Sequence, residues 1–188
     1  MSAAAARFGA KAVFHPSGTI RTETFYPTVS TNAAIYKGDL VKLDGTTGVV
    51  IISAAGDASI GVFDGCRYND STGKPTYSPF WPGSTSGATN IEFYLITDIL
   101  TVFEIQAVGS VAATAINDSA DIVYAAGSTI TGISASYLDT ANLKGAAAVG
   151  NFRIMGAALG TDNAFGDAFT ILRVTLGKNQ RFTQVNSI

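Results

Sequence analysis

Charged residues are the scarcest feature of this sequence. Only 14% of its 188 residues are Asp, Glu, Lys or Arg, and the net charge is −2, whereas a typical soluble domain carries about 25% charged residues. No basic stripe is present, so we expect no nucleic-acid partner. Charge depletion is typical of the buried core of an interface. We therefore expect partners to cover much of the surface, because a free monomer with so little charge loses solubility.

Long apolar runs are missing too, although 47% of the residues are hydrophobic. No stretch approaches the roughly 18 apolar residues that a membrane-spanning helix needs, so we expect no membrane partner. The first residues, MSAAAARFGAKAVF, carry charges that interrupt the apolar stretch, which is unlike a secretory signal. Cys66 is the single cysteine. An internal disulfide is thereby excluded, and synthesis in a reducing cytosol is the natural inference.

Reactive side chains are few. A Ser–His–Asp triad would have to use the one histidine, His15, and no nucleophile elbow accompanies it. No metal-binding CxxC, HxxxH or HExxH pattern occurs, and no GxGxxG or Walker sequence lies between a strand and a helix. The acidic runs NDSAD and DNAFGD resemble Asx-turns more than calcium loops. We therefore expect no enzymatic activity, no metal and no cofactor, with Cys66 as a packing residue.

The sequence does contain many short β-type runs separated by turn signals. The pattern predicts strands in AIYKGDLVKL, VVIIS, SIGVFDG, NIEFYLITD, LTVFEIQAVG, NFRIMGAAL and AFTILRVTLG. Spacings of about ten residues are typical of an all-β barrel or sandwich. The segment SYLDTANLKGAAAVG, residues 136–150, is the best candidate for a helical turn or loop.

The chain divides into an N-terminal arm (1–24), a β-rich core (25–178) and a polar tail (179–188). The arm shows no sustained periodicity, so we expect it to order only by lying across a neighbour, with Phe8, Val13 and Phe14 as apolar anchors.

Within the core, residues 64–90 form a long irregular stretch with three of the five prolines and the only tryptophan. Loops of this length are usually functional. We expect this one to be a contact region anchored by Tyr77, Phe80 and Trp81, whose backbone Pro79 and Pro82 restrict. The alternative is that Phe80 and Trp81 fold back onto their own barrel, as in a compact Ω-loop.

Three stretches, in order, carry a family resemblance over residues 25–180. They are YPTVSTNAAIYKGDLVKL with GVFDGCRYNDSTGKPTYSPFWPG, then TVFEIQA, and then SYLDTANLKGAAAVGNFRIMGAALGTDNAFGD with FTILRVTLGKNQ. Together they resemble the accessory capsid proteins of tailed bacteriophages, of the cement or decoration type. Both β-tulip-like barrels and jelly rolls occur in such proteins, and we favour the β-tulip-like barrel.

The resemblance implies a structural protein on the capsid exterior, made in the host cytoplasm. It would be a homotrimer that staples neighbouring major capsid subunits. The alternative is a head-fibre or tail-associated receptor- or glycan-binding module, whose aromatic loop would stack on sugars. A third possibility, a hydrolase, needs His15 in a cleft.

Overall fold

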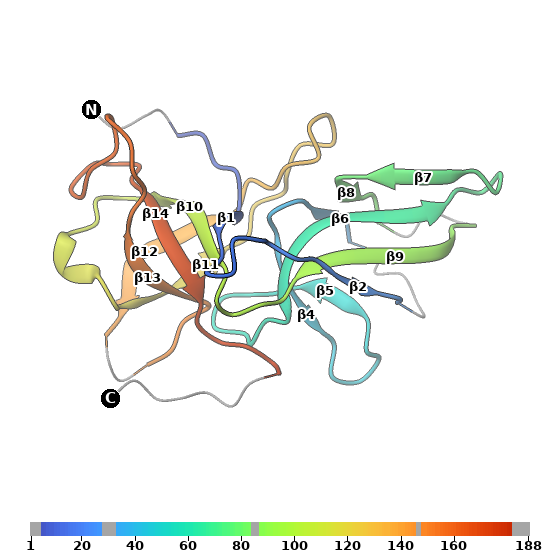
Figure 1. Ribbon diagram of the computed structural model, residues 1–188, viewed down its shortest axis with the longest axis horizontal. Coiled ribbons are helices and arrows are strands. Elements are labelled where there is room, and N and C mark those ends of the chain that lie inside the picture. Colours follow the sequence, from blue (N-terminus) through green and yellow to red (C-terminus); the bar gives the residue numbers. More distant parts are fainter. Residues whose placement is uncertain (1–4, 28–32, 84–86, 146–147, 182–188) are drawn as a thin grey trace.

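The computed structural model describes residues 5–27, 33–83, 87–145 and 148–181. In this part of the chain the fold is all-β, with fourteen strands and one short 3₁₀ turn, η1 (Ala113–Ala115). The strands form a closed barrel, an open sheet and a two-stranded ribbon, and the barrel and the open sheet lie side by side (Figure 1). The prediction of an all-β barrel or sandwich is confirmed.

The barrel contains five strands that form a continuous ring, because the last strand pairs back with the first. In ring order these are β10 (Val102–Val108), β12 (Tyr137–Lys144), β11 (Ser119–Val123), β13 (Phe152–Ala157) and β14 (Ile171–Leu176). A sixth strand, β1 (Lys11–Phe14), pairs antiparallel with β10 beyond the end of β12. The alternation in β10 was predicted and is confirmed, since Phe103, Ile105 and Ala107 are all fully buried.

The expectation of a helical turn or loop in residues 136–150 is wrong over residues 137–144, which form β12. Leu, Ala and Lys favour a helix locally. However, Leu138 and Thr140 alternate as buried residues, and β12 pairs with both β10 and β11. Pairing with β10 and β11, and not local helix propensity, decides the conformation of this segment. The sequence of the segment alone does not indicate that pairing.

The open sheet has the order β2 (Glu23–Phe25), β9 (Thr89–Ile96), β6 (Gly61–Asn69), β4 (Leu40–Leu43) and β5 (Val50–Ile52). A further strand, β7 (Pro75–Ser78), pairs with the outer half of β6, and the small ribbon joins β3 (Ile35–Tyr36) to β8 (Phe80–Trp81). The DGTTG turn between β4 and β5 forms as expected. The Asp44 carboxylate accepts hydrogen bonds from the backbone N–H groups of Thr46 and Thr47.

Most of the described residues of the 64–90 segment lie in strands and not in an irregular loop, which corrects the sequence prediction. Strand β6 runs on to Asn69, turns into β7 and is followed by β8, and β9 begins at Thr89. The turn is closed by the Asp70 carboxylate, which accepts hydrogen bonds from the N–H groups of Thr72 and Lys74. Prolines are tolerated here because Pro75 begins a strand at the sheet edge, where its missing N–H breaks no ladder.

The described part of the N-terminal arm belongs to the fold, so the expectation that it orders only against a neighbour is wrong there. Strand β1 extends the barrel and β2 edges the open sheet (Figure 1). Between residues 8 and 11 the chain is tightly packed: Gly9 N–H donates to the Ser136 carbonyl (3.1 Å) and Ala10 N–H to the Gly38 carbonyl (2.8 Å). Residues 1–4 lie outside the described residues.

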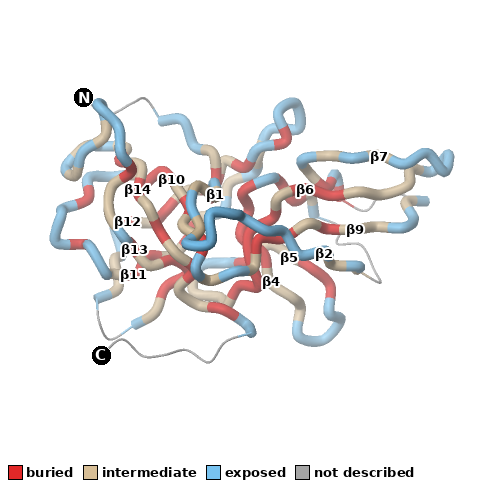
Figure 2. Tube along the Cα trace, viewed as in Figure 1, coloured by how far each residue is buried: buried red, intermediate tan, exposed pale blue. Residues whose placement is uncertain are grey.

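The hydrophobic core is continuous across the two units, as the buried segments in Figure 2 show. Leu40, Val62 and Ile96 of the open sheet pack in the same cluster as the barrel interior. A second cluster fills the open sheet's inner face around Trp81 and Phe93, whose ring centroids lie 5.5 Å apart. The cluster of buried side chains that the barrel and the open sheet share therefore packs them into one body.

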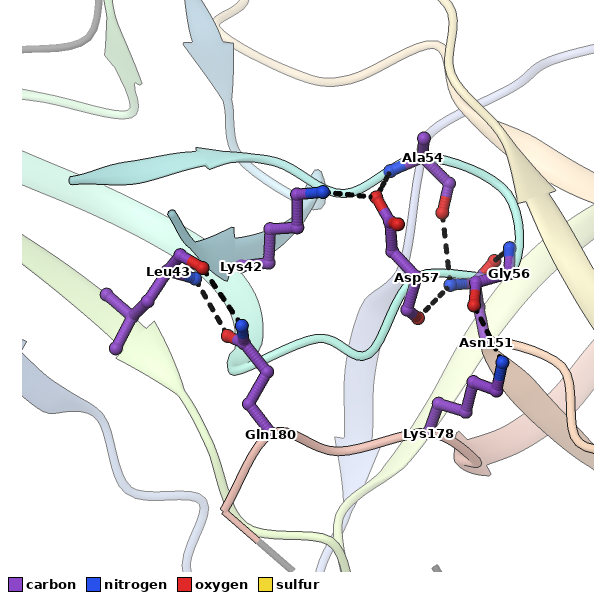
Figure 3. Close-up of polar contacts among 8 residues, drawn as sticks. All are labelled: Lys42, Leu43, Ala54, Gly56, Asp57, Asn151, Lys178 and Gln180. Carbon is purple, nitrogen blue, oxygen red and sulfur yellow. Dashed lines mark hydrogen bonds and ion pairs between the residues drawn. The ribbon is translucent and has the colours of Figure 1, made fainter. Parts of the chain in front are cut away.

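Asn151 links the two units by polar contacts (Figure 3). Its fully buried side chain lies just before β13. Its Nδ2 donates to the carbonyls of Ala54 (3.3 Å) and Asp57 (2.9 Å), and its Oδ1 accepts from the N–H groups of Gly56 (3.2 Å) and Ile122 (3.0 Å). All four hydrogen-bonding positions of the amide are thus used.

The chain beyond β14 reinforces this link. Lys178 Nζ donates to the Gly56 carbonyl (2.8 Å), and the Gln180 side chain exchanges two hydrogen bonds with the backbone of Leu43 (Figure 3). The predicted polar tail, 179–188, therefore begins with residues bound to the open sheet. Residues 182–188 lie outside the described residues.

Candidate interaction surface

The three aromatic anchors predicted in residues 64–90 occupy different environments. Trp81 is fully buried, with its ring 5.2 Å from Tyr68 in an edge-on contact, so it is a core residue and not a contact residue. Phe80 is half-buried and stacks on Tyr36 at 5.6 Å. Of the three, only Tyr77 is largely exposed, at 71%. Trp81 thus packs inward, as in the alternative interpretation, whereas Phe80 is only half-buried and a contact role for Phe80 and Tyr77 stays a prediction.

Tyr77 begins a row of side chains across three strands. The pairing register places it beside Arg67 of β6, which in turn lies beside Glu92 of β9. The Arg67 guanidinium carbon lies 5.7 Å from the centroid of the Tyr77 ring, and its Nη1 donates to Glu92 Oε1 at 2.9 Å. Tyr94 Oη donates to the other Glu92 oxygen at 3.1 Å. The pKa of Tyr94 is raised, mainly by desolvation and secondly by this hydrogen bond.

The anchors predicted in the arm are also separated. Phe14 is 55% exposed at the end of β1, whereas Val13 and Phe8 are half-buried. The guanidinium carbon of Arg7 lies 4.1 Å from the centroid of the Tyr137 ring, which holds the segment before β1 against β12. Of the arm's three predicted anchors, Phe14 is the one that presents most of its side chain to solvent.

Two exposed aliphatic side chains escaped the sequence prediction. Ile130 is 94% exposed at the tip of a turn in which Gly132 N–H donates to the Ser128 carbonyl (2.7 Å), and Leu159 is 86% exposed in the connection between β13 and β14. Single exposed apolar residues are common. In a chain with so few charges, however, each lies among uncharged neighbours, in STITG and LGT. The sequence signal that could have predicted these two exposed side chains is an aliphatic residue flanked by turn-forming residues.

A cleft of about 720 Å³ lies between the barrel and the open sheet. Its wall includes apolar side chains from both units and from the β1–β2 connection: Phe8, Ile20, Val62, Ile96, Ile133 and Ile171. Four charged residues also line it, and three of them are engaged in ion pairs. Lys37 pairs with Asp64 at 2.7 Å, and Glu104 pairs with Arg173 at 3.4 Å. The fourth lining charge is Lys11 of β1.

His15 does not lie in that cleft's lining but forms a hydrogen-bonded chain of its own. Its Nε2 contacts Asp98 Oδ2 (3.0 Å), and its Nδ1 contacts Ser17 Oγ (2.7 Å). The order serine, histidine, aspartate is the one that activates a nucleophile. However, Ser17 N–H also donates to Nδ1 (3.1 Å), and Gly18 N–H donates to the His15 carbonyl (2.9 Å). Nδ1, the nitrogen that would accept the serine proton, is thus also a hydrogen-bond acceptor for the turn at residues 15–18. Together these hydrogen bonds close the turn and tie it to Asp98.

Asp39 is a fully buried carboxylate. It accepts hydrogen bonds from Tyr36 N–H (2.8 Å) and from the hydroxyls of Ser134 and Ser136, which fixes the 134–136 segment against the start of β4. Desolvation raises the pKa of Asp39, and the three hydrogen bonds oppose that shift. The described residues contain no group of three or more His, Cys, Asp or Glu side chains arranged to hold a metal ion.

In comparisons with known proteins, no family model, no curated protein and no solved structure matches this chain. Within the described ranges, no helix has the length and apolar character that crossing a membrane requires.

Proposed function

We propose that this protein is a structural virion protein that binds the outside of a phage capsid and stabilises contacts between major capsid subunits. The observation that carries the proposal is the set of apolar side chains held out from a rigid β scaffold: Ile130, Leu159 and Tyr77 are 94%, 86% and 71% exposed. Removing apolar surface from water contributes about 25 cal/mol per Å². The family resemblance in the sequence supports the same function.

The proposed partners are the major capsid protein and two further copies of this chain. Individually exposed side chains give little affinity once the cost of association, about 4–15 kcal/mol, is subtracted. Three linked copies convert weak contacts into firm attachment through their effective concentration. Closed cyclic symmetry would also cover neutral faces that are wet in a monomer.

Add-back of purified protein to stripped, expanded capsids tests this function. Wild-type protein should saturate the shell, and Ile130→Ser and Leu159→Ser should each lower occupancy without lowering the melting temperature. Asn142→Ser, at another exposed position, is the matched control. A wild-type protein that leaves such capsids bare at saturating concentration would refute the proposal.

A second candidate function rests on the row that begins at Tyr77. An exposed aromatic face beside the Arg67–Glu92 pair, joined at 2.9 Å, offers both a stacking surface and hydrogen-bonding groups, which a receptor- or glycan-binding module of a head fibre or tail requires. Glycan binding by the isolated protein, abolished by Tyr77→Ala and retained by Tyr26→Ala, would favour this function over capsid attachment. Tyr26 is the matched control because it is equally exposed, at 71%.

A further inference from the structure

The cleft between the barrel and the open sheet has preformed walls. Lys37 N–H donates to the Gly132 carbonyl (3.0 Å) and Ser134 N–H to the Lys37 carbonyl (2.9 Å), which fixes the side that carries Ile133. On another side, β1 is paired antiparallel with β10, with Lys11 opposite Glu104 and Ala12 opposite Phe103. A volume of about 720 Å³ lies in the range of small-molecule sites, roughly 300–1,000 Å³, which are mostly apolar and largely preformed.

Burial of the lining residues defines a floor and a rim. Val62 and Ile96 are 1% and 5% exposed and form the floor, whereas Ile20 and Ile133 retain 37% and 43% exposure and stand at the rim. These rim side chains expose apolar surface to water, and a bound ligand would cover that surface. The cleft therefore favours a ligand with an apolar chain long enough to reach from rim to floor.

The charges around the cleft determine the charge of the ligand's head group. Asp64 is paired with Lys37 and Glu104 with Arg173, so each acidic charge is already neutralised by a neighbour. Lys11 is exposed and lines the cleft, and no described residue forms an ion pair or hydrogen bond with its ammonium group. Lys11 lies opposite Glu104 in the β1–β10 pairing, but Glu104 is already in an ion pair with Arg173. One positive charge without an ion pair of its own therefore remains beside an apolar cavity, and an anionic head group complements it.

We propose that this cleft binds a single-chain amphiphile with one anionic group, of the medium-chain carboxylate class. The chain packs against Val62 and Ile96, and the carboxylate faces Lys11. This site is separate from the exposed side chains of the proposed function and does not depend on it.

Titration of the full chain with octanoate, decanoate, decanol and decyltrimethylammonium, each below its critical micelle concentration, tests the site. Isoleucine methyl NMR provides the readout. The methyl groups of Ile20, Ile96, Ile133 and Ile171 should shift, while those of Ile60 and Ile154 should not. Because each buried methylene contributes about fourfold in affinity, decanoate, with two methylenes more, should bind about fifteenfold more tightly than octanoate.

Two pairs of variants separate the head-group contact from the cavity. Lys11→Gln should weaken decanoate about threefold to fivefold without affecting decanol, whereas Lys74→Gln, at an exposed lysine in the β6–β7 turn, should change neither. Thr22→Trp places a large side chain into the cleft lining and should weaken both ligands at least tenfold. Thr24→Trp, two residues along on exposed β2, should not.

The proposal is overturned if decanoate shifts none of the four methyl groups in the wild-type protein, or if decyltrimethylammonium binds as tightly as decanoate. Binding to anionic vesicles without binding to monomeric decanoate would overturn it too, because the ligand would then be a bilayer surface. The wild-type methyl map needs no variant, so poor folding of Thr22→Trp leaves the test decisive.

Discussion

Asn151 is the residue whose replacement the structure predicts to be most disruptive among its polar side chains. Its four hydrogen bonds all go to backbone groups, three of them in the 54–57 segment of the other unit. Asn151→Ala leaves buried donors and acceptors unpaired, at about 1–3 kcal/mol for each unsatisfied group. We expect a loss of at least about 3 kcal/mol in the free energy of unfolding, measured by urea denaturation.

Asn142→Ala is the control for Asn151. Asn142 is exposed, and its amide donates only to Asp139, three residues away, so its replacement should cost less than about 0.5 kcal/mol. Equal losses for the two variants would show that the inter-unit hydrogen bonds contribute nothing to stability.

Cys66 should be unreactive in the native protein. Burial raises the pKa of its thiol to about 12, and only the thiolate is nucleophilic. At pH 8 we expect a disulfide reagent to label it at the rate of protein opening, and to label the urea-unfolded chain within seconds to minutes. Rapid labelling of the folded protein would mean that β6 and β8, whose Phe80 carbonyl lies 3.4 Å from the sulfur, separate readily.

The two residues that sequence analysis placed least accurately, Trp81 and Phe80, show why contact sites are hard to predict from one sequence. Their prolines suggested an exposed loop, and the aromatic content suggested a contact. Trp81 instead packs into the core and Phe80 stacks on Tyr36, because β8 pairs with β3, about 45 residues earlier in the chain. Nothing between Pro79 and Pro82 encodes that pairing, whereas Tyr77 at a sheet edge remains exposed as expected.

At the scale of elements, β1 is predicted to be essential to the barrel. Removing residues 1–14 would expose the β10 edge at Val102, Phe103 and Glu104 and remove buried Ala10. We expect a fall of at least about 10 °C in the melting temperature, since a lost strand costs several kcal/mol and each kcal/mol shifts a chain of this size by about 2–4 °C.

Phe14→Ser is the control for that deletion. It removes a 55% exposed apolar side chain and leaves the strand pairing intact, so the melting temperature should change by less than about 3 °C. An unchanged melting temperature after the deletion would restore the idea of an arm that orders only on a neighbour.

A second element-level prediction concerns the segment that follows β14. The Arg181 guanidinium donates two hydrogen bonds to Glu23 of β2, at 2.6 and 2.8 Å, and these lower the pKa of Glu23 below 4.5. The stability from this pair is present above pH 4.5 and is lost as pH falls through the lower, folded-state pKa. Glu23→Gln should therefore make the acid-induced loss of stability shallower below about pH 4.5.

The change should stay below about 1 kcal/mol, because the pair is about 40% exposed. Urea denaturation at pH 3 and pH 6 measures it, with Asp162→Asn, an exposed carboxylate outside this pair, as the control. If the wild-type protein and Glu23→Gln lose stability in parallel on acidification, the ion pair plays no part in the acid response.

Elements differ in how far the sequence predicts them. Strand β10 was predictable because Glu104 and Gln106 alternate with Phe103, Ile105 and Ala107, which are all fully buried. Strand β12 was not, since Leu138 and Thr140 are its two buried residues and neither lies in its second half. The cleft could not be predicted at all, because its lining comes from segments that only the tertiary fold brings together.

For the whole molecule we expect one cooperative unfolding transition. The single tryptophan reports on the open sheet, and far-ultraviolet circular dichroism reports on all strands. Since Leu40, Val62 and Ile96 pack into the barrel's own cluster, urea curves from the two probes should coincide. A fluorescence transition at a lower urea concentration than the circular dichroism transition would show that the open sheet unfolds alone and that the shared core contributes little stability.

The strand order has a consequence for how the chain is made. Every strand of the open sheet comes from residues 23–96, and the ring of the barrel comes from residues 102–176. A ribosome therefore completes the open sheet first, but β1, synthesised before all of it, has no partner until β10 emerges almost ninety residues later. At about 5–20 residues per second, β1 waits roughly 4–20 seconds. The barrel closes only when β14 leaves the exit tunnel, so a chain that stalls before residue 171 carries an unsealed β10 edge for as long as it stays attached.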